Sequence, residues 1–291
     1  MRTFVLPGFA LPRAISLSAA AVAACFVAAS GTPATAQGKL DARYVATLAG
    51  VQIGRGAWIV DINGEQFTAA ASGMTAGLMR VFSSGRGTGA SRGIVRSGHL
   101  VSTAYASKIT ADKSADDVQM ALDHGTVKEF LAEPPVSPNP SRVPVKDVHR
   151  RGVLDPMTAS LMRVPGNGNT FVPESCDRTL PVFDGRMRFD VQLKFKRLDK
   201  VKAEKGYQGT VVVCAVHFRP IAGHVPDRAT IKYLVEQKDI EVWLAPIAGT
   251  RVMVPYRFSS PTPIGVGIVQ ANQFVTVPHP AHATPSSARA Q

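Results

Sequence analysis

Residues 88–94 form the glycine-rich segment Thr-Gly-Ala-Ser-Arg-Gly-Ile, and Tyr105 and Lys108 follow it. A glycine-rich segment that joins a buried strand to a helix can wrap a phosphate group, because its backbone N–H groups point at the phosphate oxygens. A tyrosine and a lysine are residue types that transfer protons beside such a site. Taken together, these residues suggest hydride transfer with a nicotinamide cofactor.

The surrounding sequence argues against this chemistry. The same letters occur in the phosphate turn of short-chain dehydrogenases, but Val95 stands where that turn has a further glycine, and residues 96–98 are not a helical sequence. The Tyr105-to-Lys108 spacing is three, rather than the four that places both side chains on one helix face. We therefore interpret the segment as a glycine-rich turn between two strands and expect no cofactor. Four arginines would lie on its surface: Arg80, Arg86, Arg92 and Arg96.

Histidines and acids are the other candidates for chemistry. The seven histidines form no His-x-His or His-Glu-x-x-His motif, so we expect no metal site; they are His99, His124, His149, His217, His224, His279 and His282. The scattered aspartates are typical of turns, helix caps or exposed strand faces; they are Asp61, Asp155, Asp177, Asp184, Asp190 and Asp239. The letters Gly-x-Ser-x-Gly occur at residues 89–93, but they lie in the turn between two strands expected above and not in the strand-to-helix turn that a nucleophilic serine needs. We expect no enzyme, although carboxylates that meet only in space leave a hydrolase as an alternative.

Residues 1–36 have the pattern of an export signal. Two arginines without an acid precede an alanine-rich apolar run over residues 14–30, and small residues follow it. We expect cleavage between Ala36 and Gln37 and a periplasmic location. The alternative is acylation at Cys25, which would make a lipoprotein, but the apolar run continues past this cysteine. No other stretch approaches ~18 consecutive apolar residues, so the mature chain should not span a membrane.

The remaining cysteines form an even pair, Cys176 and Cys214. Loss of residues 1–36 removes two arginines and no acid, which lowers the formal net charge from +12 to +10. Because exported proteins meet an oxidising compartment, we expect a structural disulfide between the two cysteines. Closing the loop between them would stabilise the fold by at most ~4 kcal/mol.

Alternation of apolar and polar residues predicts strands along most of the mature chain. Residues 187–196 alternate without a fault, which predicts a strand with one exposed face. The β-branched residues 210–219 predict its antiparallel partner. The loop expected between these two strands is basic and contains Arg197, Lys200, Lys202 and Lys205.

Three further hairpins are predicted. Residues 57–62 and 65–71 flank Asn-Gly, the strongest short hairpin signal, and residues 118–122 and 126–131 flank Asp-His-Gly. Residues 240–244 and 251–258 form the third pair. In this last pair, one strand face should hold Val252, Val254, Tyr256 and Phe258.

The expected fold is a single mainly β domain over residues 37–277. Asp155 and Pro156 predict the start of a short helix that runs to about residue 163, and Asp227 predicts the cap of a second over residues 229–237. Prolines mark a crossing loop over about residues 133–145. We expect an antiparallel β-meander that forms a strongly curved sheet or an open barrel, followed by a disordered tail over residues 278–291.

Several motifs, taken in order, resemble the exported family known as domain of unknown function 3108. They are the turn over residues 48–54, Asp155-Pro156, residues 181–186, residues 214–226 and residues 243–246. The last two resemble the α-proteobacterial branch, and the likeness covers about residues 40–274. The resemblance implies a Gram-negative envelope protein of mostly antiparallel sheet, curved like lipoprotein-carrier folds. It implies no established activity and no catalytic residues.

The basic surface indicates partners other than nucleic acid. Residues 149–151 and 197–205 lack neighbouring aromatics that would stack on bases. Anionic lipid, lipopolysaccharide or wall polymers suit the charge better. We expect a periplasmic, non-enzymatic envelope protein that holds a lipid or lipoprotein in a concave apolar sheet face. A structural or protein-interaction module and an envelope hydrolase are the alternatives.

Overall fold

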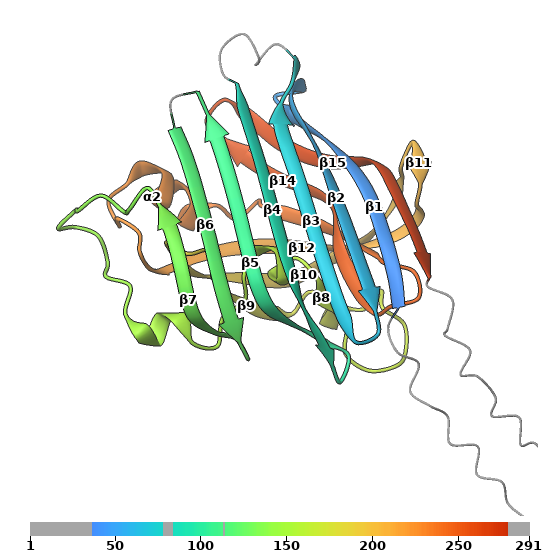
Figure 1. The fold of residues 1–291 in the computed structure, drawn as a ribbon. Helices are drawn as coiled ribbons and strands as arrows, with labels where there is room; N and C mark the ends of the chain where they lie inside the picture. Colours follow the sequence, from blue (N-terminus) through green and yellow to red (C-terminus); the bar gives the residue numbers. More distant parts are fainter. Residues whose placement is uncertain (1–36, 78–83, 113, 279–291) are drawn as a thin grey trace, which may run out of the picture. The chain divides into compact units, whose positions relative to one another are not determined.

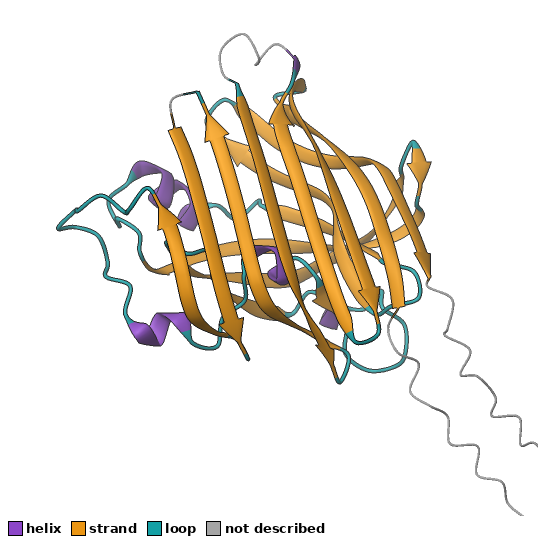
Figure 2. Cartoon of the chain, in the orientation of Figure 1, coloured by secondary structure: helices purple, strands orange, loops and turns teal. Residues whose placement is uncertain are grey.

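The computed structural model describes residues 37–77, 84–112 and 114–278 (Figures 1 and 2). The predicted export signal over residues 1–36, its cleavage site after Ala36 and the alternative lipoprotein site at Cys25 lie outside these residues. Gln37 is the first residue of the first strand. The predicted tail also lies outside, apart from Pro278, which ends the last strand.

The first half of the described chain is a run of seven antiparallel strands. They are β1 (Gln37–Leu48), β2 (Val51–Asn63), β3 (Gln66–Thr75), β4 (Gly85–Arg96), β5 (His99–Ala111), β6 (Ser114–Asp123) and β7 (Thr126–Glu133). Their side chains alternate between a buried and an exposed face. In β3, for example, Phe67 and Ala69 are buried whereas Thr68 and Ala70 are exposed. We call the buried side of these strands the inner face and the exposed side the outer face.

The second half contains the longest strands and the α-helices of the described chain. Its strands are β8 (Met162–Arg163), β9 (Arg178–Phe183), β10 (Arg188–Lys202), β11 (Lys205–Gly206), β12 (Gln208–Ala222), β13 (Glu241–Pro246), β14 (Val252–Thr262) and β15 (Gly265–Pro278). The helices are α1 (Pro156–Ala159), α2 (Ala229–Glu236) and the 3-10 helices η2 (Asp147–Arg150) and η3 (Pro173–Ser175).

The two halves form one sheet because β15 pairs with β1. The order of the main strands is β7-β6-β5-β4-β3-β2-β1-β15-β14-β13-β12-β10-β9, with β8 beside β14 and β11 beside β15. The sheet is not closed, and β7 and β9 are its two margins (Figure 1). This confirms the predicted antiparallel meander with an open sheet and two short α-helices.

The sheet bends so that its first half packs on its second half. Leu40, Val60 and Phe67 on the inner face of the first half share one core with Val213 and Val254 of β12 and β14. These strands are far apart in the strand order, so only a bent sheet brings their side chains together. Burial of such apolar side chains is the main stabilising contribution to folding.

A second core covers the opposite face of β12 and β13. Val212, Leu244 and Leu193 belong to it, and so do Cys176 and Cys214. The two cysteines form the predicted disulfide, with their Cα atoms 5.5 Å apart. The bond holds the segment after η3 against β12.

The chain that crosses from β7 to β9 contacts both margins of the sheet. It contains the prolines that predicted a crossing loop, and residues 134–146 form no strand or helix. Beyond η2, the N–H of Val153 donates to the carbonyl of Gly125 at 2.9 Å. The N–H of Leu154 donates to Pro181, and the N–H of Phe183 donates back to Leu154. The margin at β9 is therefore covered by hydrogen bonds to this chain.

The helices begin close to where the sequence predicts them. Asp155 caps α1, because its Oδ1 accepts the N–H groups of Met157 and Thr158 at 2.9 Å. The helix ends well before residue 163, since residues 162–163 pair with β14 as β8. α2 also forms, but Asp227 does not cap it; the N-cap is Arg228, without a side-chain bond.

The predicted hairpins all form, with two corrections. The basic loop expected after residue 196 is wrong, because β10 continues to Lys202 and carries Arg197 and Lys200 as strand residues; only Lys205 lies beyond it, in β11. Phe258 does not share a face with Tyr256. A register shift in β14 leaves Tyr256 unopposed, so Phe258 lies opposite Val242, on the face of the second core.

Candidate functional site

Residues 88–94 are part of strand β4 and not the predicted turn. Glycine is required at one position of this strand: a Cβ on Gly93 would come within 2.0 Å of the carbonyl oxygen of Val101. Arg86, Arg92 and Arg96 are exposed strand residues, and Arg80 lies outside the described residues.

The suspected pair of Tyr105 and Lys108 does not form. Both lie on β5, where a spacing of three places side chains on opposite faces of the sheet. Tyr105 is buried on the inner face. Lys108 lies on the outer face, where its Nζ is 3.7 Å from Asp117 Oδ2. Because these two groups cannot act on one substrate, dehydrogenase chemistry has no support here.

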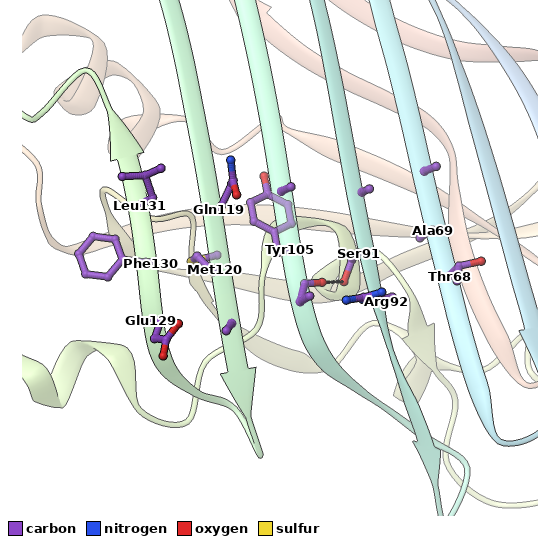
Figure 3. Close-up of a pocket in the computed structure, with 15 residues that line it drawn as sticks. Thr68, Ala69, Ser91, Arg92, Tyr105, Gln119, Met120, Glu129, Phe130 and Leu131 are labelled. Atoms are coloured by element: carbon purple, nitrogen blue, oxygen red, sulfur yellow. Dashed lines mark hydrogen bonds between the residues drawn. The ribbon is translucent and has the colours of Figure 1, made fainter.

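The outer face of β3 to β7 carries a groove of about 700 Å³ (Figure 3). The strand register aligns Ala70, Ala90 and Ala106 on three adjacent strands, and Ala104 lies opposite Ala121 in the next row. Alanine methyl groups rise little above the sheet, so these rows form a low, apolar floor. We call this surface the alanine groove.

Larger side chains border the alanine groove. Figure 3 shows Leu131 and Glu129 at the end formed by β7, Thr68 at the end formed by β3, and Arg92 and Gln119 between them. Leu131 is an apolar side chain with 49% of its surface exposed. Arg92 forms no ion pair with any residue in the described part of the chain. The groove thus combines an apolar floor with a free cation.

A buried polar cluster lies beneath the floor and fastens α1 to β4. Ser91 Oγ lies 3.1 Å from Asp155 Oδ2 and 2.9 Å from Thr158 Oγ1. Thr158 Oγ1 donates to the same carboxylate at 2.7 Å, and Ser102 Oγ lies 3.2 Å from Ser91 Oγ. These residues are buried, and their hydrogen bonds are internal. The cluster therefore supports the floor and offers no open site for a substrate. Burial also raises the pKa of the nearby Tyr105 phenol, which keeps it neutral.

A smaller cavity lies on the face of the second core. This apolar cavity of about 190 Å³ lies beside α1 and is lined by side chains such as Leu180, Phe189 and Val191. Sites for small-molecule ligands are commonly about 300–1,000 Å³, a range that includes the alanine groove but not this cavity. On the inner face of the first half, Met157 of α1 packs over Gly89.

Three of the histidines and acids singled out in the sequence, His124, His224 and Asp184, have local structural contacts or are buried. Among residues 37–77, 84–112 and 114–278, no group of three or more His, Cys, Asp or Glu could hold a metal ion. His124 contacts Asp123 and Arg96, and His224 is buried, which lowers its pKa. Asp184 accepts two N–H groups of the turn between β9 and β10, and burial raises its pKa. His279 and His282 lie outside the described residues.

The described part of the chain has no helix with the length and apolarity needed to cross a membrane.

Comparisons with known proteins agree with a domain whose activity is unknown. No curated protein matches the chain. A similar solved structure is described as a β-barrel-like protein of domain of unknown function DUF1849 from Brucella abortus; the match covers 83% of this chain and 98% of that chain, with 7% identity and a TM-score of 0.44. The model of the family described as protein of unknown function DUF3108 matches residues 43–271. The chain belongs to this DUF3108 family.

Proposed function

We propose that this chain is an exported, non-enzymatic binding protein of the cell envelope, which holds the apolar chain of an amphiphile in the alanine groove. The observation that carries the proposal is the groove itself, an apolar floor in a space of about 700 Å³ on the outer face of the sheet. The signal-like residues 1–36 and the disulfide between Cys176 and Cys214 support export.

The dimensions of the groove suit a single alkyl chain. It runs across five strands from β3 to β7, and four spacings of about 4.8 Å give a length of about 19 Å. One leaflet of a bilayer has a hydrocarbon thickness of about 15 Å, which is the space that one acyl chain occupies. An acyl chain lying across the strands would cover Ala70, Ala90 and Ala106 and remove their methyl groups from water.

Arg92 favours an anionic head group. It borders the alanine groove and has no acidic partner among the described residues, so it is available to pair with a carboxylate or phosphate. This fits the charge of a chain with 33 basic and 21 acidic residues.

The proposal moves the ligand from the concave face, where the sequence places it, to the outer face. The inner face is filled where Leu40, Val60 and Phe67 meet the second half of the sheet, and the apolar cavity on the face of the second core is about 190 Å³. The hydrolase alternative would need an accessible polar cluster. The cluster around Asp155 is buried and serves to hold α1.

Equilibrium dialysis with dodecanoate tests the proposal. Ala90→Trp fills the floor of the groove, whereas Thr88→Trp places the same side chain on the same strand and face, outside the groove lining. We expect saturable binding to the wild type, a loss of at least about tenfold in Ala90→Trp, equivalent to about 1.4 kcal/mol, and little change in Thr88→Trp. Arg92→Glu should weaken binding of dodecanoate more than binding of the uncharged dodecyl maltoside. Absence of saturable binding to the wild type, or equal losses in both tryptophan variants, would overturn the proposal.

A further inference from the structure

Strand β7 is a sheet margin with free backbone groups. It pairs with β6 on one side. On its other side, no described residue forms a hydrogen bond with the backbone of residues 128–133. The opposite margin differs, because β9 is bonded to Leu154 of the crossing chain. Among the described residues, the β9 margin thus has backbone hydrogen bonds to the crossing chain, whereas β7 has none on the side away from β6; we call this edge of β7 the free margin.

β7 is held in place as a strand without being covered. On its inner face, the Phe130 ring packs edge-on against Phe183 with 6.1 Å between ring centroids, and the Arg150 guanidinium lies 4.5 Å from the Phe130 centroid. Phe130 nevertheless remains 40% exposed, and its neighbour Leu131 on the outer face is 49% exposed. A free margin has unpaired backbone groups to which another strand can bond, and these two large apolar side chains would pack against that strand.

The outer face of β7 is acidic. Glu129 and Glu133 lie on either side of Leu131 on this face, and neither forms an ion pair with a described residue. The chain as a whole carries a formal net charge of +12. The order acid, apolar, acid along the strand complements a partner strand with the order base, apolar, base.

The same two acids disfavour pairing with a second copy of β7. In an antiparallel pair centred on Leu131, Glu129 of one copy would lie opposite Glu133 of the other. Like charges directly opposite each other on neighbouring strands are destabilising. The strand thus discourages self-pairing in this register and leaves its backbone groups for a partner of opposite charge.

We propose that the free margin of β7 binds an extended segment of another protein by strand addition, and that this segment has a basic, an apolar and a basic residue in succession on the face that continues the outer face of β7. Backbone hydrogen bonds would provide the pairing, and side chains opposite Glu129, Leu131 and Glu133 would provide the selectivity. The inference does not rest on the lipid proposal, but the two surfaces overlap, since Glu129, Phe130 and Leu131 also line the alanine groove.

Fluorescence anisotropy tests the inference with a labelled peptide that has lysine, valine and lysine at every second position and threonine between them. An added strand forms hydrogen bonds through one of its two edges. N-methylation of every second residue should therefore abolish binding in one of the two possible series and leave it nearly unchanged in the other. The double change Glu129→Lys with Glu133→Lys should weaken binding more than about tenfold and transfer affinity to the peptide in which glutamates replace the lysines. The matched control, Glu65→Lys with Glu204→Lys, changes the net charge equally at other exposed acids and should bind like the wild type.

Three results would contradict the inference. Absence of binding to the wild type would mean that the charges on β7 only protect the margin from aggregation. Equal affinity for both N-methylated series would indicate attraction by charge without strand pairing. Sedimentation that shows a dimer dispersed by the Glu129→Lys and Glu133→Lys change would replace the peptide with a second copy of the chain.

Discussion

The two halves of the sheet differ in how many of their faces are buried. In β12, Val211, Val212, Val213 and Cys214 are buried in succession, because one core covers each face. In β3 and β6, burial alternates along the strand, because every second side chain lies on the outer face and reaches solvent. The second half therefore resembles the interior of a layered protein, whereas the first half has one sheet face exposed to solvent.

This difference separates stability from binding. The second half takes part in both of these cores and contains the disulfide. The first half contributes its inner face to the core around Leu40 and to a third buried cluster that includes Val118 and Met120. Its outer face offers the alanine groove and the free margin of β7. Changes in the second half should alter the free energy of unfolding, and changes on the outer face should alter binding alone.

The largest expected effect on the free energy of unfolding comes from truncating a side chain of the second core. Leu244 is fully buried in β13, so Leu244→Ala should lower the free energy of unfolding by about 3–5 kcal/mol. Leu131→Ala removes the same atoms from an exposed position of β7 and should change it by less than about 0.5 kcal/mol. Urea unfolding of both variants measures the contrast, and equal losses would break the comparison.

Loss of the disulfide should come next. Cys176 and Cys214 are 38 residues apart, and the double change to serine should lower the free energy of unfolding by about 2–4 kcal/mol. Denaturation with and without reductant checks this for the wild type, while the serine variant serves as the control that reductant should not affect. A wild type indifferent to reductant would show that the second half does not depend on the bond.

A smaller effect is expected from the ion pairs of Glu241. Its carboxylate accepts bonds from Arg197 at 3.1 and 2.9 Å and contacts Lys196, so the pKa of Glu241 is held below its usual value. Glu241→Gln should cost about 1 kcal/mol at pH 7. Because the folded state lowers this pKa, the stabilisation is present above the unfolded value of about 4.3 and is lost as the pH falls through the folded value.

The difference between wild type and Glu241→Gln should therefore shrink in urea titrations at acidic pH. Lys108→Gln is the matched change on the outer face, where the pair with Asp117 is largely exposed; it should shift the free energy of unfolding by less than about 0.5 kcal/mol. If the difference in the free energy of unfolding between wild type and Glu241→Gln does not change with pH, the ion pairs of Glu241 are not its cause.

The smallest effect on stability is expected for Ile59, which lies opposite Ala70 on the outer face and is 55% exposed. Ile59→Ala should leave the free energy of unfolding within about 0.5 kcal/mol of the wild type. Val60→Ala changes the next residue, which is buried on the inner face, and should lower the free energy of unfolding clearly. Equal results for the two in thermal unfolding would mean that the outer face is covered.

Much of the strand structure follows from local sequence. The alternation of residues 187–196 and the Asn-Gly turn before β3 are local signals, and both gave the correct pairing. β4 was missed because its glycines resemble a turn. These glycines alternate with larger residues, so that Gly85, Gly87 and Gly89 share the inner face. This period of two was the sequence signal that could have predicted a strand.

The alanine groove could not be predicted in the same way. Ala70, Ala90 and Ala106 are separated by turns and align only through the registers of β3, β4 and β5. Alanine forms no recognisable motif in the sequence. It shapes the groove because its side chain is short and leaves space above the sheet. The bulge in β14 likewise depends on pairing with β13, which is why the shared face expected for Tyr256 and Phe258 was wrong.

Hydrogen–deuterium exchange with and without dodecanoate tests most directly whether binding belongs to the first half. The account predicts that the amphiphile slows exchange in β3 to β7, across the groove from Ala70 to Leu131, and leaves β9 to β14 unchanged. Protection centred on α1 and on β9 to β14, around Leu180 and Phe189, would place the ligand in the cavity on the face of the second core and contradict the account.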